Sequence, residues 1–292
     1  MLKQYCQEKG KIVDHALAAF VPSENVYPPK IFEAMRYSLF AGGKRLRPIL
    51  LMAAADSIGG KGSDYLNVAC GLEMIHTYSL IHDDLPAMDD DDYRRGKLTS
   101  HKVFGEGMAI LAGDGLLTAA FTVMLAQPGV QADVLIKVVG EISNAAGALG
   151  MIGGQVIDLS SEGEKIDIDT LSYMHQSKTG ALFKAAVRAG AQLAGGEEWQ
   201  IASLTEYAKQ YGLAFQITDD ILDVTGTQEK IGKPVGSDVK NHKATYVTLY
   251  SLGEAQDMAN QAVTNALQAL KQFGQEADIL RELVRALLTR DN

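Results

Sequence analysis

The chain has 292 residues, of which 47% are hydrophobic and 22% are charged, so it can bury a large core and lacks the composition of a disordered protein. Its formal net charge of −9 argues against a general nucleic-acid binder, which needs a basic surface to neutralise phosphates. The two cysteines, Cys6 and Cys70, lack zinc and C-x-x-C spacings, which favours free thiols. No apolar signal region follows Met1, so we expect a cytoplasmic protein.

Helical periodicity dominates the chain and strand patterns are scarce, which predicts an all-α fold. The expected apolar elements, in chain order, lie at 31–40, 49–58, 64–84, 108–126, 131–159, 169–194, 198–224 and about 243–289. A charged loop at 86–105 and a polar loop at 226–241 interrupt them. No fixed repeat or linker marks a second domain, so we expect one domain over 1–292.

The segment 108–126 is the most apolar long window of the chain. A membrane-spanning helix needs roughly 20 apolar residues with few charges. This window contains Asp114, Gly113 and Gly115, and Gly107 directly precedes it. We therefore interpret it as a buried core helix and expect no membrane span.

An acidic segment ends the predicted helix 64–84. Its sequence, at 82–92, is HDDLPAMDDDD, and it contains six aspartates. Pro86 blocks continuation of the helix, so the carboxylates crowd at a helix C-terminus, where the helix dipole disfavours negative charge. A hard divalent cation with oxygen ligands compensates such a cluster best. The alternative is a solvated acidic loop without a metal, although the EF-hand spacing is absent.

A second acidic segment lies at 216–223, with the sequence QITDDILD. Asp219 and Asp223 are four residues apart and share a helix face with Gln216. Like charges at this spacing repel each other, and the flanking residues are apolar. A surface stripe is the alternative interpretation. Two such clusters in one helical chain favour a site in which several Mg²⁺ ions and a diphosphate lie between two carboxylate walls.

Basic residues complement the two acidic segments. The turn GGKRLRP at 42–48 carries three cations, Arg94-Arg95 follow the first acidic segment, and Lys178 and Lys233 lie further along. Arginine suits bidentate phosphate recognition and lysine acts as a point charge, although each residue alone is also consistent with a solvated surface. His76 precedes Asp83 by two helical turns and shares its face, so it is either a site residue or a core histidine.

These segments together resemble the trans-polyprenyl diphosphate synthases, and they are most similar to the bacterial short-chain farnesyl diphosphate synthases. The resemblance covers nearly the whole chain in order: 42–48, 76–96, Gly153-Gly154-Gln155 with Asp158, Lys178-Thr179, 219–223 and Gly232-Lys233. It implies an all-α bundle around a deep central cavity, a homodimer, and several Mg²⁺ ions, with Mn²⁺ as a possible substitute.

The resemblance also implies a role for each matching position. Asp83, Asp89 and Asp219 resemble Mg²⁺ ligands, and Asp84 and Asp223 resemble supporting metal carboxylates. The residues that resemble the allylic diphosphate site are Arg94, Lys178, Thr179, Gln216 and Lys233. Those that resemble the isopentenyl diphosphate site are Lys44, Arg47, His76 and Arg95. Among these, Lys178, Arg94, Asp83 and Asp219 are the expected catalytic residues. The first motif has four residues between Asp84 and Asp89, which leaves the roles of Asp90, Asp91 and Asp92 open.

Product length depends on the floor of the expected cavity. In the resembling family, the position of Tyr78, with Ser79 beside it, lines the floor under the growing chain. A bulky aromatic side chain there predicts an early stop and a C15 product, (2E,6E)-farnesyl diphosphate, from dimethylallyl or geranyl diphosphate. Tyr78 is alternatively a plain core residue. Three rival functions are a geranylgeranyl diphosphate synthase, a class I terpene cyclase and a non-catalytic subunit of a prenyl synthase complex.

Overall fold

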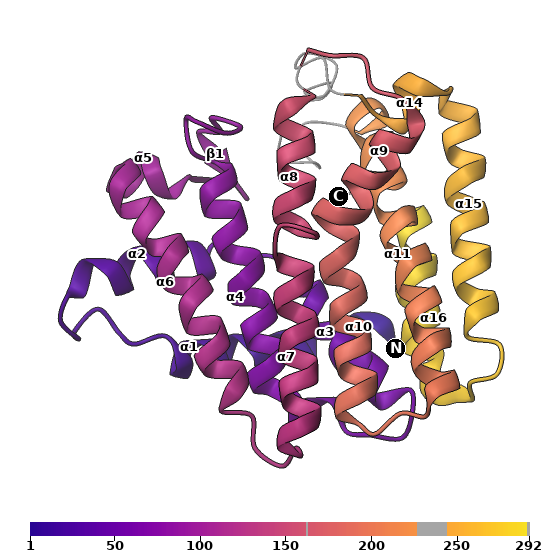
Figure 1. The fold of residues 1–292 in the computed structure, drawn as a ribbon, viewed down its shortest axis with the longest axis horizontal. Helices are drawn as coiled ribbons and strands as arrows, with labels where there is room; N and C mark the ends of the chain where they lie inside the picture. The colour runs from indigo at the N-terminus through magenta and orange to yellow at the C-terminus, as the bar shows by residue number, and fades with distance from the viewer. Residues whose placement is uncertain (162, 227–243, 291–292) are drawn as a thin grey trace.

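The structure is a computed structural model that describes residues 1–161, 163–226 and 244–290. Over these residues it is almost entirely helical, as predicted (Figure 1). The first half of the chain forms α1 (Leu2–Phe20), α2 (Pro29–Leu39), α3 (Leu46–Asp56), the 3-10 turn η1 (Gly62–Tyr65), α4 (Leu66–Asp83), β1 (Tyr93–Arg94), β2 (Lys97–Leu98), α5 (Ser100–Phe104), α6 (Glu106–Leu125) and α7 (Ala132–Ala146).

The second half of the chain is helical as well. It forms α8 (Met151–Ser160), α9 (Ile168–His175), the π-helical turn η2 (Gln176–Gly180), α10 (Ala181–Leu193), α11 (Glu198–Thr225), α14 (Tyr246–Leu249), α15 (Leu252–Ala269), the 3-10 turn η3 (Gln275–Ala277), α16 (Asp278–Ala286) and the 3-10 turn η4 (Leu287–Thr289). The two short strands pair antiparallel, with Tyr93 opposite Leu98.

Helix α4 lies in the interior of the first half of the molecule. It is apolar on all sides, and most of its residues between Val68 and Ile81 are buried, which is the pattern of a core helix. It packs along α6, and Gly71 allows this approach because a Cβ atom there would lie 2.4 Å from Met124 of α6. Beyond Asp83, the chain leaves the helix before Pro86, as predicted. The first aspartate motif therefore sits on a rigid helix end.

Helix α11 has the corresponding position in the second half of the molecule. It packs against α10 and α15, and an apolar cluster that includes Phe183, Tyr207 and Tyr211 holds it in place. Phe183 meets the rings of Tyr211 and Phe215 at centroid distances of 5.3 and 5.0 Å. The second aspartate motif lies near the C-terminal end of this helix. Each motif is thus positioned by its own packed cluster.

The expected elements differ from the observed ones in several places. The charged segment 86–105 contains the β1–β2 hairpin and α5. Helix α1 was not among the expected elements. The segment 131–159 is divided into α7 and α8, because the chain turns at Gly147 and re-enters a helix at Met151. The segment 169–194 contains the π-helical turn η2.

Helix α6 is only partly the core helix that the sequence predicts. By length and composition, Glu106–Leu125 and Ala132–Ser160 are apolar enough to cross a membrane, but the second of them is interrupted at the α7–α8 turn. About 39% of the apolar window of α6 is buried, while Ile110 and Leu111 are exposed. The interior face of the helix is therefore core, and its outer face is an exposed apolar surface. Cys6 and Cys70 are free thiols, as expected.

Candidate active site

The first aspartate motif is folded back onto the end of α4. The backbone N–H of Asp89 donates to the carbonyl oxygen of Asp83 at 2.9 Å, and that of Asp90 donates to Leu85 at 3.1 Å. The four residues between Asp84 and Asp89 are therefore taken up in a tight turn. This turn brings Asp89 back to the helix end that carries Asp83, so two of the predicted Mg²⁺ ligands belong to one small region.

Asp83 faces polar groups from the second half of the chain. The amide of Gln155 in α8 donates to its carboxylate, and the ammonium of Lys178 in η2 lies 3.9 Å away. The same ammonium is 2.6 Å from Asp158 of α8. Gly154 makes this arrangement possible, because a Cβ atom there would lie 2.2 Å from the backbone nitrogen of Lys178. The π-helical turn that holds Lys178 is the kind of irregularity that often occurs at functional sites.

Asp84 is buried against Arg94. The guanidinium of Arg94 contacts one carboxylate oxygen of Asp84 through Nε at 2.6 Å and through Nη2 at 2.5 Å, and it reaches Asp91 at 3.5 Å. Burial raises the pKa of Asp84, and the hydrogen bond from Arg94 opposes that shift. The ion pair therefore holds Arg94 beside the aspartates of the first motif.

The basic turn 42–47 is held by a buried ion-pair network. Arg45, with a left-handed φ of 51°, donates to Asp14 and to the buried Glu73, both at 2.8 Å. Gly43, at φ 124°, lies against the guanidinium of Arg95, where a Cβ atom would approach within 2.7 Å. Arg95 also donates to the carbonyl of Gly42. The turn and the hairpin strand that follows the first motif are thereby fastened together.

Several cations converge beside this turn. The guanidinium of Arg47 lies 4.6 Å from the ring centre of Phe183, and its Nε is buried without a hydrogen-bond partner in the described part of the chain. Burial lowers the pKa of Arg47 to about 10. Burial lowers the pKa of His76 well below its ordinary value, and Arg47 and Arg95 lower it further, so His76 is neutral near pH 7. A bound anion would relieve the repulsion between such cations, so the cluster is a candidate anion site.

The second motif lies beside the C-terminal end of the described chain. Asp219 is exposed and contacts the guanidinium of Arg290, which also donates to Thr218 and to the carbonyl of Phe215, both at 2.8 Å. Burial lowers the pKa of Lys44, Arg290 lowers it further, and Asp219 raises it. Lys44 from the basic turn therefore lies near the second motif. Of the residues predicted for isopentenyl diphosphate, Lys44 thus lies beside the second aspartate motif.

The other aspartates of α11 are less accessible. Asp223 is buried, whereas Asp219 is exposed, although both were expected on one face. Asp220 is buried and accepts the backbone N–H of Tyr246 at 2.7 Å, which caps α14. Gln216 and Thr179 are half-buried. Lys233 lies outside the described residues, as does nearly all of the predicted loop 226–241.

Tyr78 lies one and a half turns before the first motif, in the buried cluster of the first half of the molecule. Its ring meets that of His82 edge-on at 5.7 Å, and the His82 Nε2 is 3.0 Å from the carbonyl oxygen of Ile110 in α6. The hydroxyl of Ser79 donates to the carbonyl of His76. Tyr78 thus contacts His82, which in turn contacts α6, and this packing suits both a cavity floor and a core residue.

Gln155 and Asp158, near the predicted site, were not given a role from the sequence, and Arg290 was not given a partner. Gln155 and Asp158 are part of the resembling segments, but only the fold shows that α8 brings them to Asp83 and Lys178. Arg290 comes from the chain terminus, where no local pattern indicates a partner 71 residues away.

The family model described as polyprenyl synthetase matches residues 28–287. A dimethylallyltranstransferase of Fischerella ambigua is 48% identical over 99% of this chain and 84% of that protein. A farnesyl diphosphate synthase of Geobacillus stearothermophilus is 44% identical over 100% of this chain and 98% of that protein.

A solved structure agrees with these relatives. The crystal structure of the geranylgeranyl pyrophosphate synthetase from Pyrococcus horikoshii superposes with a TM-score of 0.92 at 30% identity, covering 99% of this chain and 98% of that chain. The all-α fold and the family expected from the motifs are confirmed. The chain belongs to the polyprenyl synthetase family.

Proposed function

We propose that this protein condenses isopentenyl diphosphate with dimethylallyl or geranyl diphosphate to give (2E,6E)-farnesyl diphosphate, with Mg²⁺ as its metal. The observation that carries the proposal is that each aspartate motif lies beside cations: Lys178 beside Asp83, and Lys44 and Arg290 beside Asp219. The farnesyl diphosphate synthase of Geobacillus stearothermophilus, similar over its full length, supports the product. The family match over 28–287 supports one domain spanning 1–292.

The donor set suits Mg²⁺. Asp83 and Asp89 come from one helix end and Asp219 from another, with Asp84 and Asp223 behind them, and all five offer only oxygen ligands, as Mg²⁺ requires. Bound Mg²⁺ neutralises charge on the diphosphate leaving group. On the protein side, Lys178, Arg94, Thr179, Gln216 and Lys233 are proposed to bind the allylic diphosphate and to stabilise the negative charge that develops as its C–O bond ionises.

The second substrate is assigned to the basic turn. We assign isopentenyl diphosphate to Lys44, Arg47, Arg95 and the neutral His76. Arg95 lowers the pKa of Arg47, and a bound anion would relieve this repulsion. The double bond of this substrate attacks C1 of the allylic cation, and a proton then leaves to the departing diphosphate. The apolar residues of α4 and α6 exclude water, which would otherwise capture the cation.

Product length is assigned to Tyr78, and its replacement tests the assignment. Tyr78→Ala is expected to shift the main product from C15 to C20 or longer, because the aromatic ring that stops the chain is removed. The measurement is product chromatography with geranyl and isopentenyl diphosphates. Tyr27→Ala, at a side chain that is 90% exposed, is the matched control and should keep the C15 product. A folded Tyr78→Ala enzyme that still makes only C15 would assign Tyr78 to the core alone.

The main rival is a C20 product. The Pyrococcus horikoshii protein is a geranylgeranyl pyrophosphate synthetase, so the fold accommodates that length as well. The wild-type product separates the two. The aspartates of both motifs are all present, which argues against a non-catalytic subunit, and the second motif DDILD differs from that of a class I terpene cyclase.

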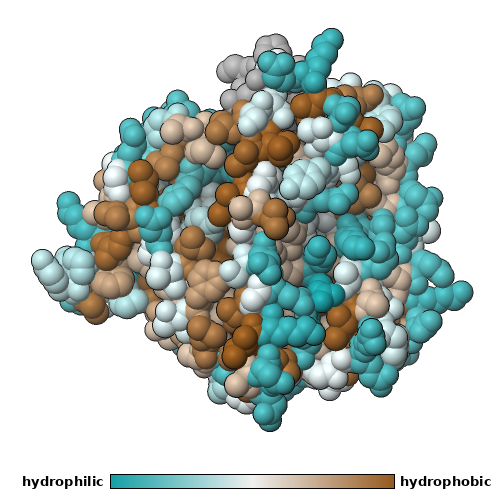
Figure 2. Space-filling view, in the orientation of Figure 1, coloured by the Kyte–Doolittle hydropathy of each residue, from teal (hydrophilic) through white to brown (hydrophobic). Residues whose placement is uncertain are grey.

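We further propose that the protein is a cytoplasmic homodimer. Exposed apolar side chains gather over the outer faces of α6, α7 and α8 (Figure 2). They include Leu111 at 55% exposure, Ile136 at 66%, Leu149 at 90% and Val156 at 56%. A second copy of the chain would cover such a surface, and apolar patches of this kind mark interaction sites. Sedimentation at the mass of one 31.4 kDa chain would contradict the dimer.

A further inference from the structure

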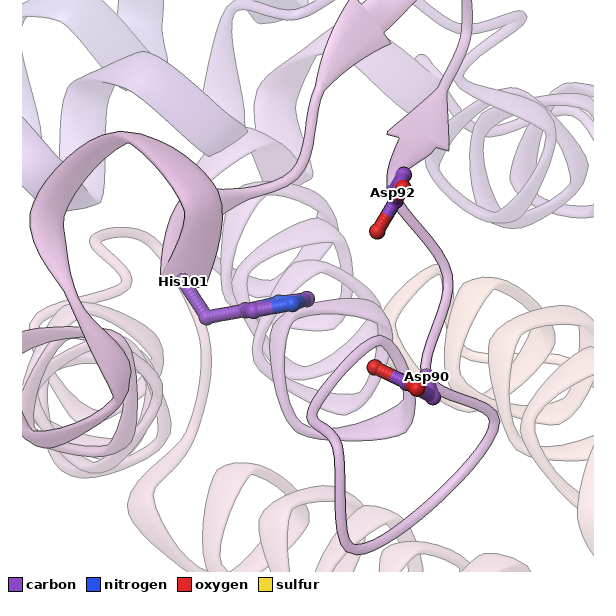
Figure 3. Close-up of side chains that lie close together, drawn as sticks. All are labelled: Asp90, Asp92 and His101. Carbon is purple, nitrogen blue, oxygen red and sulfur yellow. The ribbon is translucent and has the colours of Figure 1, made fainter.

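Three side chains that the proposed reaction does not use converge beside the first motif. Asp90 and Asp92 precede the β1–β2 hairpin, and His101 follows it in α5. One potential ligand atom from each lies within 4.8 Å of the others. Figure 3 shows the imidazole extending from α5 toward the two carboxylates. Both aspartates are exposed, whereas the histidine is 6% exposed.

The hydrogen bonds of His101 leave one ring nitrogen available. The hydroxyl of Thr99 donates its one hydrogen to the carbonyl of Asp91 at 2.8 Å, so it accepts a hydrogen from Nδ1 of His101, which is 3.2 Å away. The Nε2 atom is buried and has no hydrogen-bond partner among the described residues. A neutral imidazole with its hydrogen on Nδ1 presents a lone pair on Nε2. Metal-binding histidines are oriented in this way by a second hydrogen bond.

The surrounding charge also favours a cation. Lys102 forms an ion pair with one oxygen of Asp92 at 2.7 Å, which leaves the other oxygen of that carboxylate and both oxygens of Asp90 for a ligand. Two carboxylates facing one ammonium group keep the pocket negative. A neutral imidazole with two carboxylates is a donor set typical of Zn²⁺, whereas Mg²⁺ prefers oxygen ligands alone.

We propose that Asp90, Asp92 and His101 form a binding site for one divalent transition-metal ion of the Zn²⁺ type, separate from the Mg²⁺ ions of the two aspartate motifs. Tetrahedral Zn²⁺ with bonds of about 2.1 Å needs ligand atoms roughly 3.5 Å apart. The ligand atoms lie within 4.8 Å of one another, and the two exposed aspartates can bring them closer by rotating their side chains. The metal would join the two ends of the hairpin, where the backbone N–H of Thr99 already donates to Asp92 at 3.0 Å.

The proposed metal site lies next to residues of the first aspartate motif and of the hairpin. The hairpin carries Arg94, and Asp89 immediately precedes the site. A metal that ties Asp90 and Asp92 to α5 would also hold Arg94 and Asp89 in place. The site therefore acts as a structural clamp on the loop, and its ligands contact no substrate in the proposed reaction.

Metal retention tests this site without an activity assay. The purified full-length protein is dialysed against micromolar Zn²⁺ in millimolar Mg²⁺, so that Mg²⁺ saturates the oxygen-only sites, and bound zinc is measured by elemental analysis. The wild type should retain one Zn²⁺ per chain. His101→Ala should lower the zinc affinity at least tenfold, because one of three ligands is lost. His15→Ala, at an exposed histidine of α1, and Asp83→Asn, in the Mg²⁺ motif, should retain zinc like the wild type.

A second variant covers the case in which His101→Ala does not fold. Asp90 is exposed, so Asp90→Asn removes a ligand without disturbing the core, and it should also lower the zinc affinity at least tenfold. Circular dichroism verifies the fold of each variant. The proposal is overturned if the wild type retains no zinc in excess Mg²⁺, or if folded Asp90→Asn retains as much zinc as the wild type.

Discussion

Asp83→Asn is expected to lower kcat by about 10³-fold, or ~4 kcal/mol in the activation barrier, while leaving the protein folded. Asparagine keeps the shape of the side chain and its contact with Gln155, but it removes the charge that binds metal and faces Lys178 at 3.9 Å. The allylic diphosphate then loses the positive charge that stabilises its departure. Steady-state kinetics with geranyl and isopentenyl diphosphates at saturating Mg²⁺ measure the effect.

The control for this result is another aspartate at a helix end. Asp133 is exposed in the first turn of α7, away from both motifs, so Asp133→Asn should keep kcat within about twofold of the wild type. If Asp83→Asn retained more than a tenth of the wild-type kcat, Asp83 would not be a metal ligand in the reaction. Excess Mg²⁺ should not restore the kcat of Asp83→Asn, because the variant lacks a metal ligand at the reacting centre.

Arg47→Gln is expected to raise the KM for isopentenyl diphosphate about 100-fold, which corresponds to one strong charge-assisted hydrogen bond. Arg47 is half-buried, it stacks on Phe183, and burial lowers its pKa to about 10, so a bound anion has more to gain here than at a solvated arginine. The KM for geranyl diphosphate should change less than threefold, because that substrate is assigned to the other set of cations. Initial rates with each substrate varied in turn give both values.

Two further variants sharpen this test. Arg47→Lys should recover only part of the affinity, because an ammonium group cannot make the two parallel hydrogen bonds of a guanidinium. Arg285→Gln, at a surface arginine that pairs with Glu282 at 3.1 Å, should match the wild type. If Arg47→Gln raised the KM values for both substrates equally, the basic turn would not bind isopentenyl diphosphate alone.

The helical framework and the family could be predicted because their signals are local. The apolar period, Pro86 within the first motif and the pair Gly195-Gly196 indicate where α4 and α10 end and where α11 begins. The motif spacing is also local, so the ligand candidates could be named from sequence. The tight turn that returns Asp89 to Asp83 explains how the longer form of the motif keeps its two aspartates together.

The remaining features depend on contacts between distant segments. Asp83 meets Gln155 72 residues later in the chain, and Arg290 meets Asp219 across 71 residues. No periodicity indicates such pairs. The hairpin at 93–98 is too short for a strand pattern, and the cluster with His101 exists only because that hairpin returns the chain. Asp223 shares a helix face with the exposed Asp219 but is buried, and this burial likewise reflects the packing around α11.

The most direct test of the central claim is the product of the wild-type protein. Purified protein is incubated with Mg²⁺, isopentenyl diphosphate and geranyl diphosphate, and the chain length of the product is measured by chromatography after removal of the diphosphate. We predict that C15 farnesyl diphosphate is the main product and that a chelator of divalent metals abolishes its formation. A main product of C20, or no condensation in the presence of Mg²⁺, would contradict the proposed function.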